Sequence, residues 1–279
     1  MPSLSKDLDA KVVRECKRRR LSQRTCKTYL YGIHRFLNWS KKDLRYISKK
    51  DVRLFLEYLS DKNLAGNTMN TYHMAIRFLF ENVLEKRMWI DIKYSKTPRK
   101  LPEVLSKEEI RKLIDSIKNF KHQLMICFMY SSGLRVSELI NIKIKNLNLE
   151  NNFGFVRNGK GGKDRLITLS NNLIPAIRKL IFDENLENKD YLFRSNRGRK
   201  YSIRTIQKIV DKSSKICGIK RKIHPHTLRH SFATHLIENG YDITNVQALL
   251  GHKSPETTLI YTHIASPNLI NTKSPLEEL

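Results

Sequence analysis

The sequence predicts a mainly helical α+β protein of two domains, on the basis of three observations. Apolar residues recur at helical spacing over most of the 279 residues. After residue 149 the pattern changes to short strand-like runs, which predicts a small antiparallel sheet. Near residue 98 a segment rich in proline and basic residues interrupts the periodicity. We therefore expect helical domains at 1–92 and 103–279, joined by a basic linker at 93–102.

The first domain reads as a bundle of about four helices. Ser22 is placed to cap a helix with one apolar face, and Ser48 followed by Asp51 resembles a capping box that opens another. Asn67 is expected to cap the last helix of the bundle. Basic residues on these helices are available for a phosphate backbone, although each taken alone is also an ordinary solvated charge.

The second domain opens at Ser106, where Glu109 completes a capping box. A more apolar helix at 124–130 ends at Gly133. Two strands follow, at 153–157 and 165–169, joined by a glycine-rich tip with two lysines. Helices at 173–182 and 202–217 complete this part of the domain. The tip lacks the Gly-Lys-Ser/Thr ending of a phosphate-binding loop, so nucleotide binding is not favoured.

The charge of the chain points to a polyanionic partner. It contains 53 lysines and arginines against 27 acidic residues, a net charge of +26, and both halves are basic. General surface solvation is the alternative, but it does not call for so large an excess. No run of eighteen apolar residues occurs and the N-terminus is charged, so we expect a soluble, cytoplasmic protein. Four widely spaced cysteines indicate reduced, buried thiols, with no disulfide framework and no metal site.

Residues 226–261 gather polar side chains at the ends of short helices. The first helix is indicated by an apolar repeat at i, i+4 and i+8, formed by Leu228, Phe232 and Leu236. His226 and Arg229 are three residues apart and therefore share a face of it. Thr244 and Ser254 are expected to cap two further helices, the first of which ends at Gly251.

These residue types suit attack on a phosphodiester. Arginine holds two phosphate oxygens with its planar fork, histidine moves a proton near neutral pH, and the phenol of Tyr261 can act as a nucleophile. Two other interpretations remain open for this stretch alone. One is a helix-turn-helix in which these side chains only pack or touch phosphate. The other is a zinc site at His226 and His230, which Thr227 disfavours because metalloproteases of this spacing carry glutamate there.

Two further basic positions belong to the same hypothesis. Arg135 stands at the turn after Gly133, and Glu138 lies one helical turn later, where its carboxylate can orient the guanidinium. A plain surface ion pair is the alternative. A lysine of the hairpin tip, Lys160 or Lys163, could enter a groove or give a proton to a leaving oxygen.

Taken together, five motifs resemble the tyrosine recombinases, most closely the Xer type. They are Ser132-Gly133-Leu134-Arg135-Val136-Ser137-Glu138-Leu139, Lys160 in the hairpin, His226-x-x-Arg229, Leu250-Gly251-His252 and Tyr261-Thr262-His263. The resemblance covers nearly the whole chain, and it implies a SAM-like helical domain that clasps DNA in front of a catalytic domain. The site residues that it implies are Arg135, Lys160, His226, Arg229, His252 and Tyr261, with Glu138 in support.

The resemblance also implies a mechanism. Tyr261 would attack the scissile phosphate, form a 3′-phosphotyrosyl bond and release a 5′-hydroxyl, with Lys160, favoured over Lys163, as general acid. The two catalytic arginines would hold the nonbridging oxygens, and His226 and His252 would assist proton transfer. No metal or other cofactor is expected, because the arginines and the lysine supply the positive charge that metal ions provide in many nucleases. ATP is not expected either, because the phosphotyrosine conserves the bond energy.

The expected partner is double-stranded DNA with inverted binding arms. A homo-tetramer would assemble on two sites, with segment 264–279 docking on a neighbouring subunit; a frayed polar tail is the alternative for this segment. Chromosome dimer resolution is the expected task. The alternatives are a mobile-element integrase of the same chemistry, a type IB topoisomerase-like enzyme, and a DNA-binding regulator without catalysis.

Overall fold

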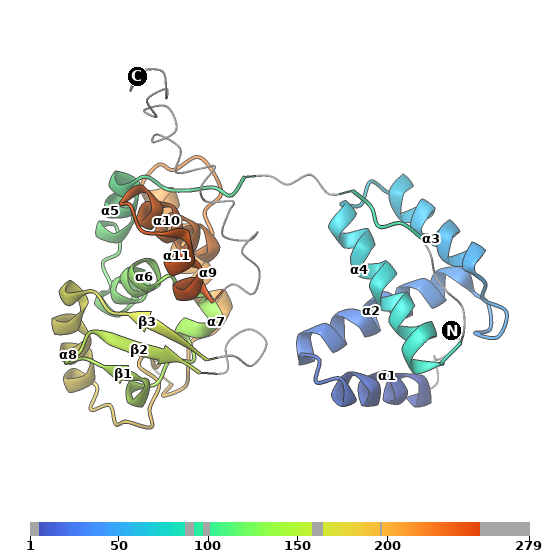
Figure 1. Ribbon diagram of the computed structural model, residues 1–279, viewed down its shortest axis with the longest axis horizontal. Helices are drawn as coiled ribbons and strands as arrows, with labels where there is room; N and C mark the ends of the chain where they lie inside the picture. The colour runs from blue at the N-terminus through green and yellow to red at the C-terminus, as the bar shows by residue number, and fades with distance from the viewer. Residues whose placement is uncertain (1–5, 87–91, 97–100, 158–163, 196, 252–279) are drawn as a thin grey trace, which may run out of the picture. The chain divides into compact units, whose positions relative to one another are not determined.

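The computed structural model covers the whole chain and describes residues 6–86, 92–96, 101–157, 164–195 and 197–251. It divides into two compact units, Met1–Arg99 and Lys100–Leu279 (Figure 1). Each unit has its own hydrophobic core. The mainly helical fold with one small antiparallel sheet is confirmed.

The first unit is a bundle of helices around an aromatic core. Its elements are α1 (Lys6–Arg18), α2 (Gln23–Ser40), α3 (Lys49–Asp61), α4 (Gly66–Arg77) and the π-helical segment η1 (Phe78–Val83). Phe36 contacts the rings of Phe55 and Phe80, with centroids 5.2 and 6.4 Å away. These three side chains are fully buried, so the aromatic contacts fix how the helices pack.

Two of the three predicted helix starts in this unit are confirmed. The Ser22 hydroxyl accepts a hydrogen bond from the Thr25 amide at 3.0 Å, and the Asp51 carboxylate accepts one from the Ser48 amide at 2.9 Å. The prediction for Asn67 is wrong, because α4 begins at Gly66 with Ala65 as its N-cap. There the Ala65 carbonyl accepts the Thr68 amide, so the turn forms through the backbone alone.

The start of the basic segment after this bundle packs against α4. The Asn70 side chain donates to the Ser95 carbonyl at 3.0 Å and accepts from the Ser95 amide at 2.8 Å. The Tyr94 ring lies 4.7 Å from the His73 ring. Residues 92–96 are thus held by the first unit.

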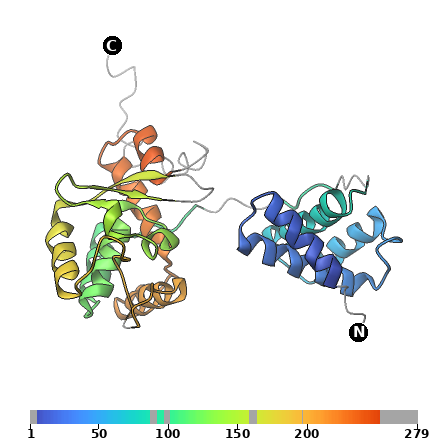
Figure 2. The same ribbon diagram turned by 90° about the horizontal axis from the view of Figure 1, so that it is seen from below.

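The second unit wraps helices around a three-stranded sheet. Its helices are α5 (Lys107–Asp115), α6 (Phe120–Ser132), α7 (Val136–Leu139), α8 (Ile174–Asp183), α9 (Ile203–Ile216), α10 (Pro225–Glu238) and α11 (Ile243–Leu250), with 3₁₀ turns η2 (Ile144–Asn146) and η3 (Asn171–Leu173). The strands are β1 (Leu147–Asn148), β2 (Phe153–Val156) and β3 (Arg165–Thr168) in the order β1-β2-β3, all antiparallel. The short strand β1 adds to the predicted hairpin. Helix α10 packs against α6, and α11 against β3 (Figures 1 and 2).

The helix ends around this sheet follow local chemistry. Glu109 and Ser106 form the predicted capping box, in which each side chain accepts the other residue's amide. Both α6 and α11 end at a left-handed glycine, as predicted, with φ of 57° at Gly133 and 61° at Gly251. The prediction for Thr244 is wrong. Asp242 caps α11 instead and accepts the Thr244 amide at 2.7 Å, since a carboxylate is the better acceptor at a helix N-terminus.

Two predictions from composition can be compared with the described residues. None of the helices described there is long and apolar enough to cross a membrane. All four cysteines are free thiols. Only Cys16 is buried, so the expectation of buried thiols was too broad.

Gly133 provides a test of the helix stop. An added Cβ would lie 2.4 Å from the Phe232 ring at a left-handed φ, so Gly133→Ala is expected to cost about 2–4 kcal/mol of unfolding free energy. The matched control is Gly218→Ala, at φ 69° with open space around the Cβ, which should cost only about 1 kcal/mol.

Urea unfolding followed by circular dichroism measures this difference. Both tryptophans, Trp39 and Trp89, precede residue 100, so their fluorescence follows the first unit and should not shift. Equal costs for the two alanines would contradict the packing argument.

Candidate active site

The candidate site begins at the turn between α6 and α7. Arg135 is the N-cap of α7, and its amide donates to Glu138 Oε2 at 2.9 Å. Its guanidinium donates to Glu138 Oε1 at 2.7 Å, so one carboxylate holds both ends of the residue. The side chain of Glu138 is only 4% exposed. The pair is therefore largely buried, unlike an ordinary surface ion pair.

Arg229 enters the same place from α10. Its Nη1 donates to the Gly133 carbonyl at 2.6 Å and its Nη2 to the Leu250 carbonyl at 2.5 Å. The side chain is 4% exposed, and Nη1 lies 4.0 Å from Glu138 Oε2. One guanidinium therefore links the ends of α6 and α11, which are more than a hundred residues apart in the chain.

A third arginine comes from the first residue of β3. Arg165 Nη2 donates to Glu138 Oε2 at 2.7 Å, and Nη1 donates to the Leu249 carbonyl. Its side chain is 8% exposed. We did not predict this residue from the sequence. A signal was present, because Arg165 and Ile167 are two positions apart in one strand and therefore share a face, and Ile167 is buried.

This cluster contains more positive than negative side chains, and they shift one another's pKa values. Burial alone would raise the pKa of the Glu138 carboxyl, but Arg165 and Arg135 outweigh burial and hold that pKa below its ordinary value. Burial lowers the pKa of the Arg165 guanidinium, against the opposing pull of Glu138. Three guanidiniums thus surround one ionised carboxylate, and a net positive charge remains in a poorly hydrated place. Such a site favours an anion.

Two histidines of α10 border the cluster. The His226 ring reaches the surface, yet partial burial, followed by the charges of Arg229 and Arg135, lowers its pKa. Burial, with His226 and Arg229 adding to it, lowers the pKa of His230 to about 4. The two rings lie 6.5 Å apart. Both imidazoles are therefore neutral at pH 7, and His226 can accept a proton there.

The structure places four of the seven expected site residues in one region: Arg135, Glu138, His226 and Arg229. Lys160, His252 and Tyr261 lie outside the described residues. Lys160 belongs to the connection between β2 and β3, and His252 directly follows Gly251.

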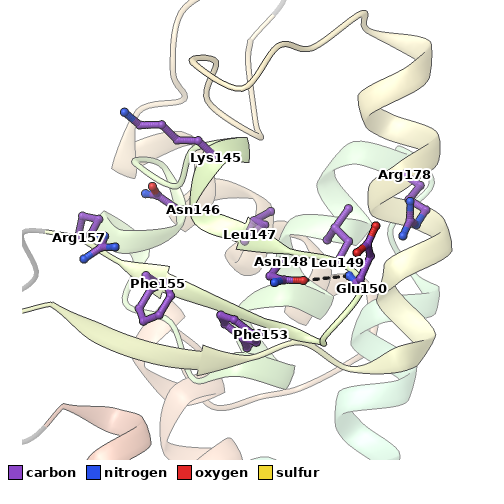
Figure 3. A pocket seen from close by; sticks show the side chains of 10 residues that line it. All are labelled: Lys145, Asn146, Leu147, Asn148, Leu149, Glu150, Phe153, Phe155, Arg157 and Arg178. Carbon is purple, nitrogen blue, oxygen red and sulfur yellow. Dashed lines mark hydrogen bonds between the residues drawn. The ribbon is translucent and has the colours of Figure 1, made fainter.

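A separate hollow of about 580 Å³ lies on the face of the sheet that points away from the hydrophobic core (Figure 3). Phe153 and Phe155 line the hollow. They alternate along β2 with Gly154 and Val156, which are buried on the core face of the sheet. Arg165 pairs with Val156 in the ladder and so belongs to the core face. The hollow is therefore distinct from the arginine cluster.

Comparison with known proteins assigns the family. Residues 103–267 match the phage integrase family, and residues 8–90 match the phage integrase N-terminal SAM-like domain. The chain belongs to the phage integrase family. It is a tyrosine recombinase, an enzyme of site-specific recombination that cleaves and rejoins DNA strands. The resemblance stated from the motifs is thus confirmed.

Named relatives of this recombinase extend over most of its length. It is 36% identical to the tyrosine recombinase XerA of Pyrococcus horikoshii, covering 89% of this chain and 86% of the relative. It is 33% identical to XerD of Oceanobacillus iheyensis, covering 90% and 91%. A crystal structure of the XerH recombinase bound to palindromic difH substrate aligns with a TM-score of 0.75 at 26% identity, covering 96% and 85%.

The depressed pKa of His230 predicts a pH effect on the stability of this recombinase. An unfolded histidine has a pKa near 6.5, so between pH 6.5 and 4 the unfolded state binds more protons than the folded state. Folding is therefore destabilised as pH falls through this window, and the penalty is absent above it. In His230→Gln the loss of unfolding free energy between pH 7 and 4.5 should be smaller by on the order of 2 kcal/mol. Urea titrations at both pH values measure it; equal losses in the two proteins would contradict the prediction.

Proposed function

We propose that this recombinase cuts duplex DNA with Tyr261 and that the buried arginine cluster receives the scissile phosphate. The observation that supports this is the excess of charge: Arg135, Arg165 and Arg229 face the single carboxylate of Glu138. A phosphodiester carries the negative charge that this arrangement lacks, and guanidiniums match its oxygens in geometry.

The proposed reaction transfers a phosphoryl group without net loss of bond energy. The Tyr261 oxygen attacks phosphorus, the bond to the 5′-oxygen breaks, and Lys160 gives that oxygen a proton. Arg135 and Arg229 stabilise the charge that builds on the nonbridging oxygens. His226 and His252 handle the proton of the phenol. The reverse attack by a 5′-hydroxyl rejoins the strand and restores the phenol.

The proposed partner is double-stranded DNA with inverted arms. The net charge of +26 supports binding to a phosphate backbone, and the XerH relative was captured on a palindromic substrate. Each subunit carries one Tyr261 and cuts one strand, so exchange between two duplexes requires four subunits. We propose a homo-tetramer in which segment 264–279 docks on a neighbouring subunit.

The proposed biological task is Xer-type resolution of chromosome dimers. Relatives named XerA and XerD support the Xer type. Integration of a mobile element uses the same chemistry and would differ in where the target site lies. Mapping the chain's footprint on its own genome separates the two: a single chromosomal site supports dimer resolution, and sites at element ends support integration.

The nucleophile is tested by Tyr261→Phe. The variant should bind the footprinted duplex with wild-type affinity and form no covalent adduct on a nicked form of it, because only the phenolic oxygen is lost. Adduct is measured as protein–DNA bands on a denaturing gel.

Tyr241→Phe is the matched control, since Tyr241 is an exposed tyrosine of the same unit, and it should form adduct normally. Adduct formation by Tyr261→Phe would show that another residue attacks.

The docking segment is tested by truncation after His263. The shortened chain should still bind one duplex and form adduct, but complexes of two duplexes should fall by at least about tenfold, because the subunit contacts are lost. Native gels with two duplexes of different length measure this. Undiminished two-duplex complexes would contradict the proposed role of segment 264–279.

A further inference from the structure

Arg165 connects three segments of the second unit that are far apart in the sequence. Its own strand leads away from the hairpin tip, its Nη2 reaches Glu138 on α7 at 2.7 Å, and its Nη1 reaches the Leu249 carbonyl at the end of α11. A second, longer contact of 3.5 Å runs from Nη2 to the Gly133 carbonyl. Both terminal nitrogens thus contact protein groups.

The end of α11 also packs on the aliphatic part of this side chain. An added Cβ at Gly251 would lie 2.7 Å from Arg165 Cδ, closer than real contacts allow. The φ of 61° at Gly251 is one that other residues adopt only with strain. The chain therefore leaves α11 over the Arg165 side chain, in a path that requires glycine.

The orientation of the Arg165 side chain leaves one of its nitrogen donors without a hydrogen bond. Its Nε is buried and has no hydrogen-bond partner among the described residues. A buried donor without a partner is unfavourable, so it persists where other contacts hold the group in place. Here the contacts at Nη1, at Nη2 and at Gly251 fix the guanidinium.

We propose that Arg165 is a positioning residue, whose fork sets the distance between Glu138 and the last turn of α11. It thereby fixes the point from which the chain continues into His252, relative to the Arg135–Arg229 pair. This inference rests on the proposed function, because its consequence is seen in strand cleavage. A lysine keeps the charge but has one nitrogen, so it cannot reach Glu138 and the Leu249 carbonyl in the same geometry.

The test compares Arg165→Lys and Arg165→Gln in the full chain with the exposed control Arg178→Gln. The substrate is the footprinted duplex, and two quantities are measured: its dissociation constant, and the single-turnover rate of adduct formation at saturating protein. Arg165→Lys keeps the charge, so it should bind within about threefold of wild type and cleave about 10- to 100-fold more slowly, since a misplacement near 1 Å is costly in rate. Arg165→Gln also removes one charge of the cluster, so it should cleave no faster than Arg165→Lys and bind DNA more weakly. The control should match wild type in both quantities.

Two results would overturn the proposal. A wild-type cleavage rate in Arg165→Lys would show that only the charge matters. A parallel fall of binding and cleavage in Arg165→Lys, together with a lower melting temperature, would show a purely structural role. Wild-type protein that forms no adduct would instead refute the proposed function, and the two failures are thus distinguishable.

Gly251→Ala probes the same contact if the Arg165 variants do not fold. The added methyl displaces the Arg165 side chain from the end of α11, and the charges of Arg165 and Glu138 are both retained. It should reproduce the pattern of retained binding and slowed cleavage. A wild-type cleavage rate in Gly251→Ala would overturn the proposal.

Discussion

The arginine cluster in the described part of the second unit is built around the buried carboxylate of Glu138. Glu138 pairs with Arg135 and Arg165 at 2.7 Å each, and Arg229 stands 4.0 Å away. Without this charge, three guanidiniums would repel one another in a place with little water, at a cost of several kcal/mol. With it, the arginines can approach one another, and part of their positive charge is left over. The carboxylate permits the cluster to form without neutralising it.

Backbone carbonyls complete the support of the cluster. Arg229 and Arg165 donate to Gly133, Leu249 and Leu250, which lie at the C-terminal ends of α6 and α11. Helix C-termini carry partial negative charge, so they hold cations without cancelling a full unit of charge. A further carboxylate in the same position would bind the guanidiniums more strongly and remove the attraction for an anion. Neutral anchors therefore suit the phosphate site that we propose.

The sequence predicted those features that are determined by short-range chemistry. The capping box at Ser106, the glycine stop at Gly133 and the Arg135–Glu138 pair each involve residues within four positions, and all three are confirmed. The predictions for Asn67 and Thr244 were wrong. Both are residue types that often cap helices, but each is the second residue of its helix and not the N-cap. Local preference does not determine where the backbone begins to turn.

Long-range contacts set the limit of prediction for the site. Arg165 meets Glu138 across 27 positions and Leu249 across 84, and nothing in the local pattern names those partners. Its place on the inner face of β3 was readable from the alternation with Ile167. The reason for a charge on that face could not be predicted from the sequence, because it depends on how α7 and α11 pack against the strand. The roles of Lys160, His252 and Tyr261 stay predictions, since they lie outside the described residues.

The leftover charge also bears on proton transfer in the proposed mechanism. Burial, then Arg229 and Arg135, lowers the pKa of His226, so the imidazole is neutral at pH 7 beside these two arginines. A phosphate bound between those arginines would offset their charge and raise the proton affinity of His226. The histidine would then be a stronger base once substrate is in place than before. In the proposed mechanism, the excess of charge would thus link phosphate binding to the ability of His226 to accept the proton of the phenol.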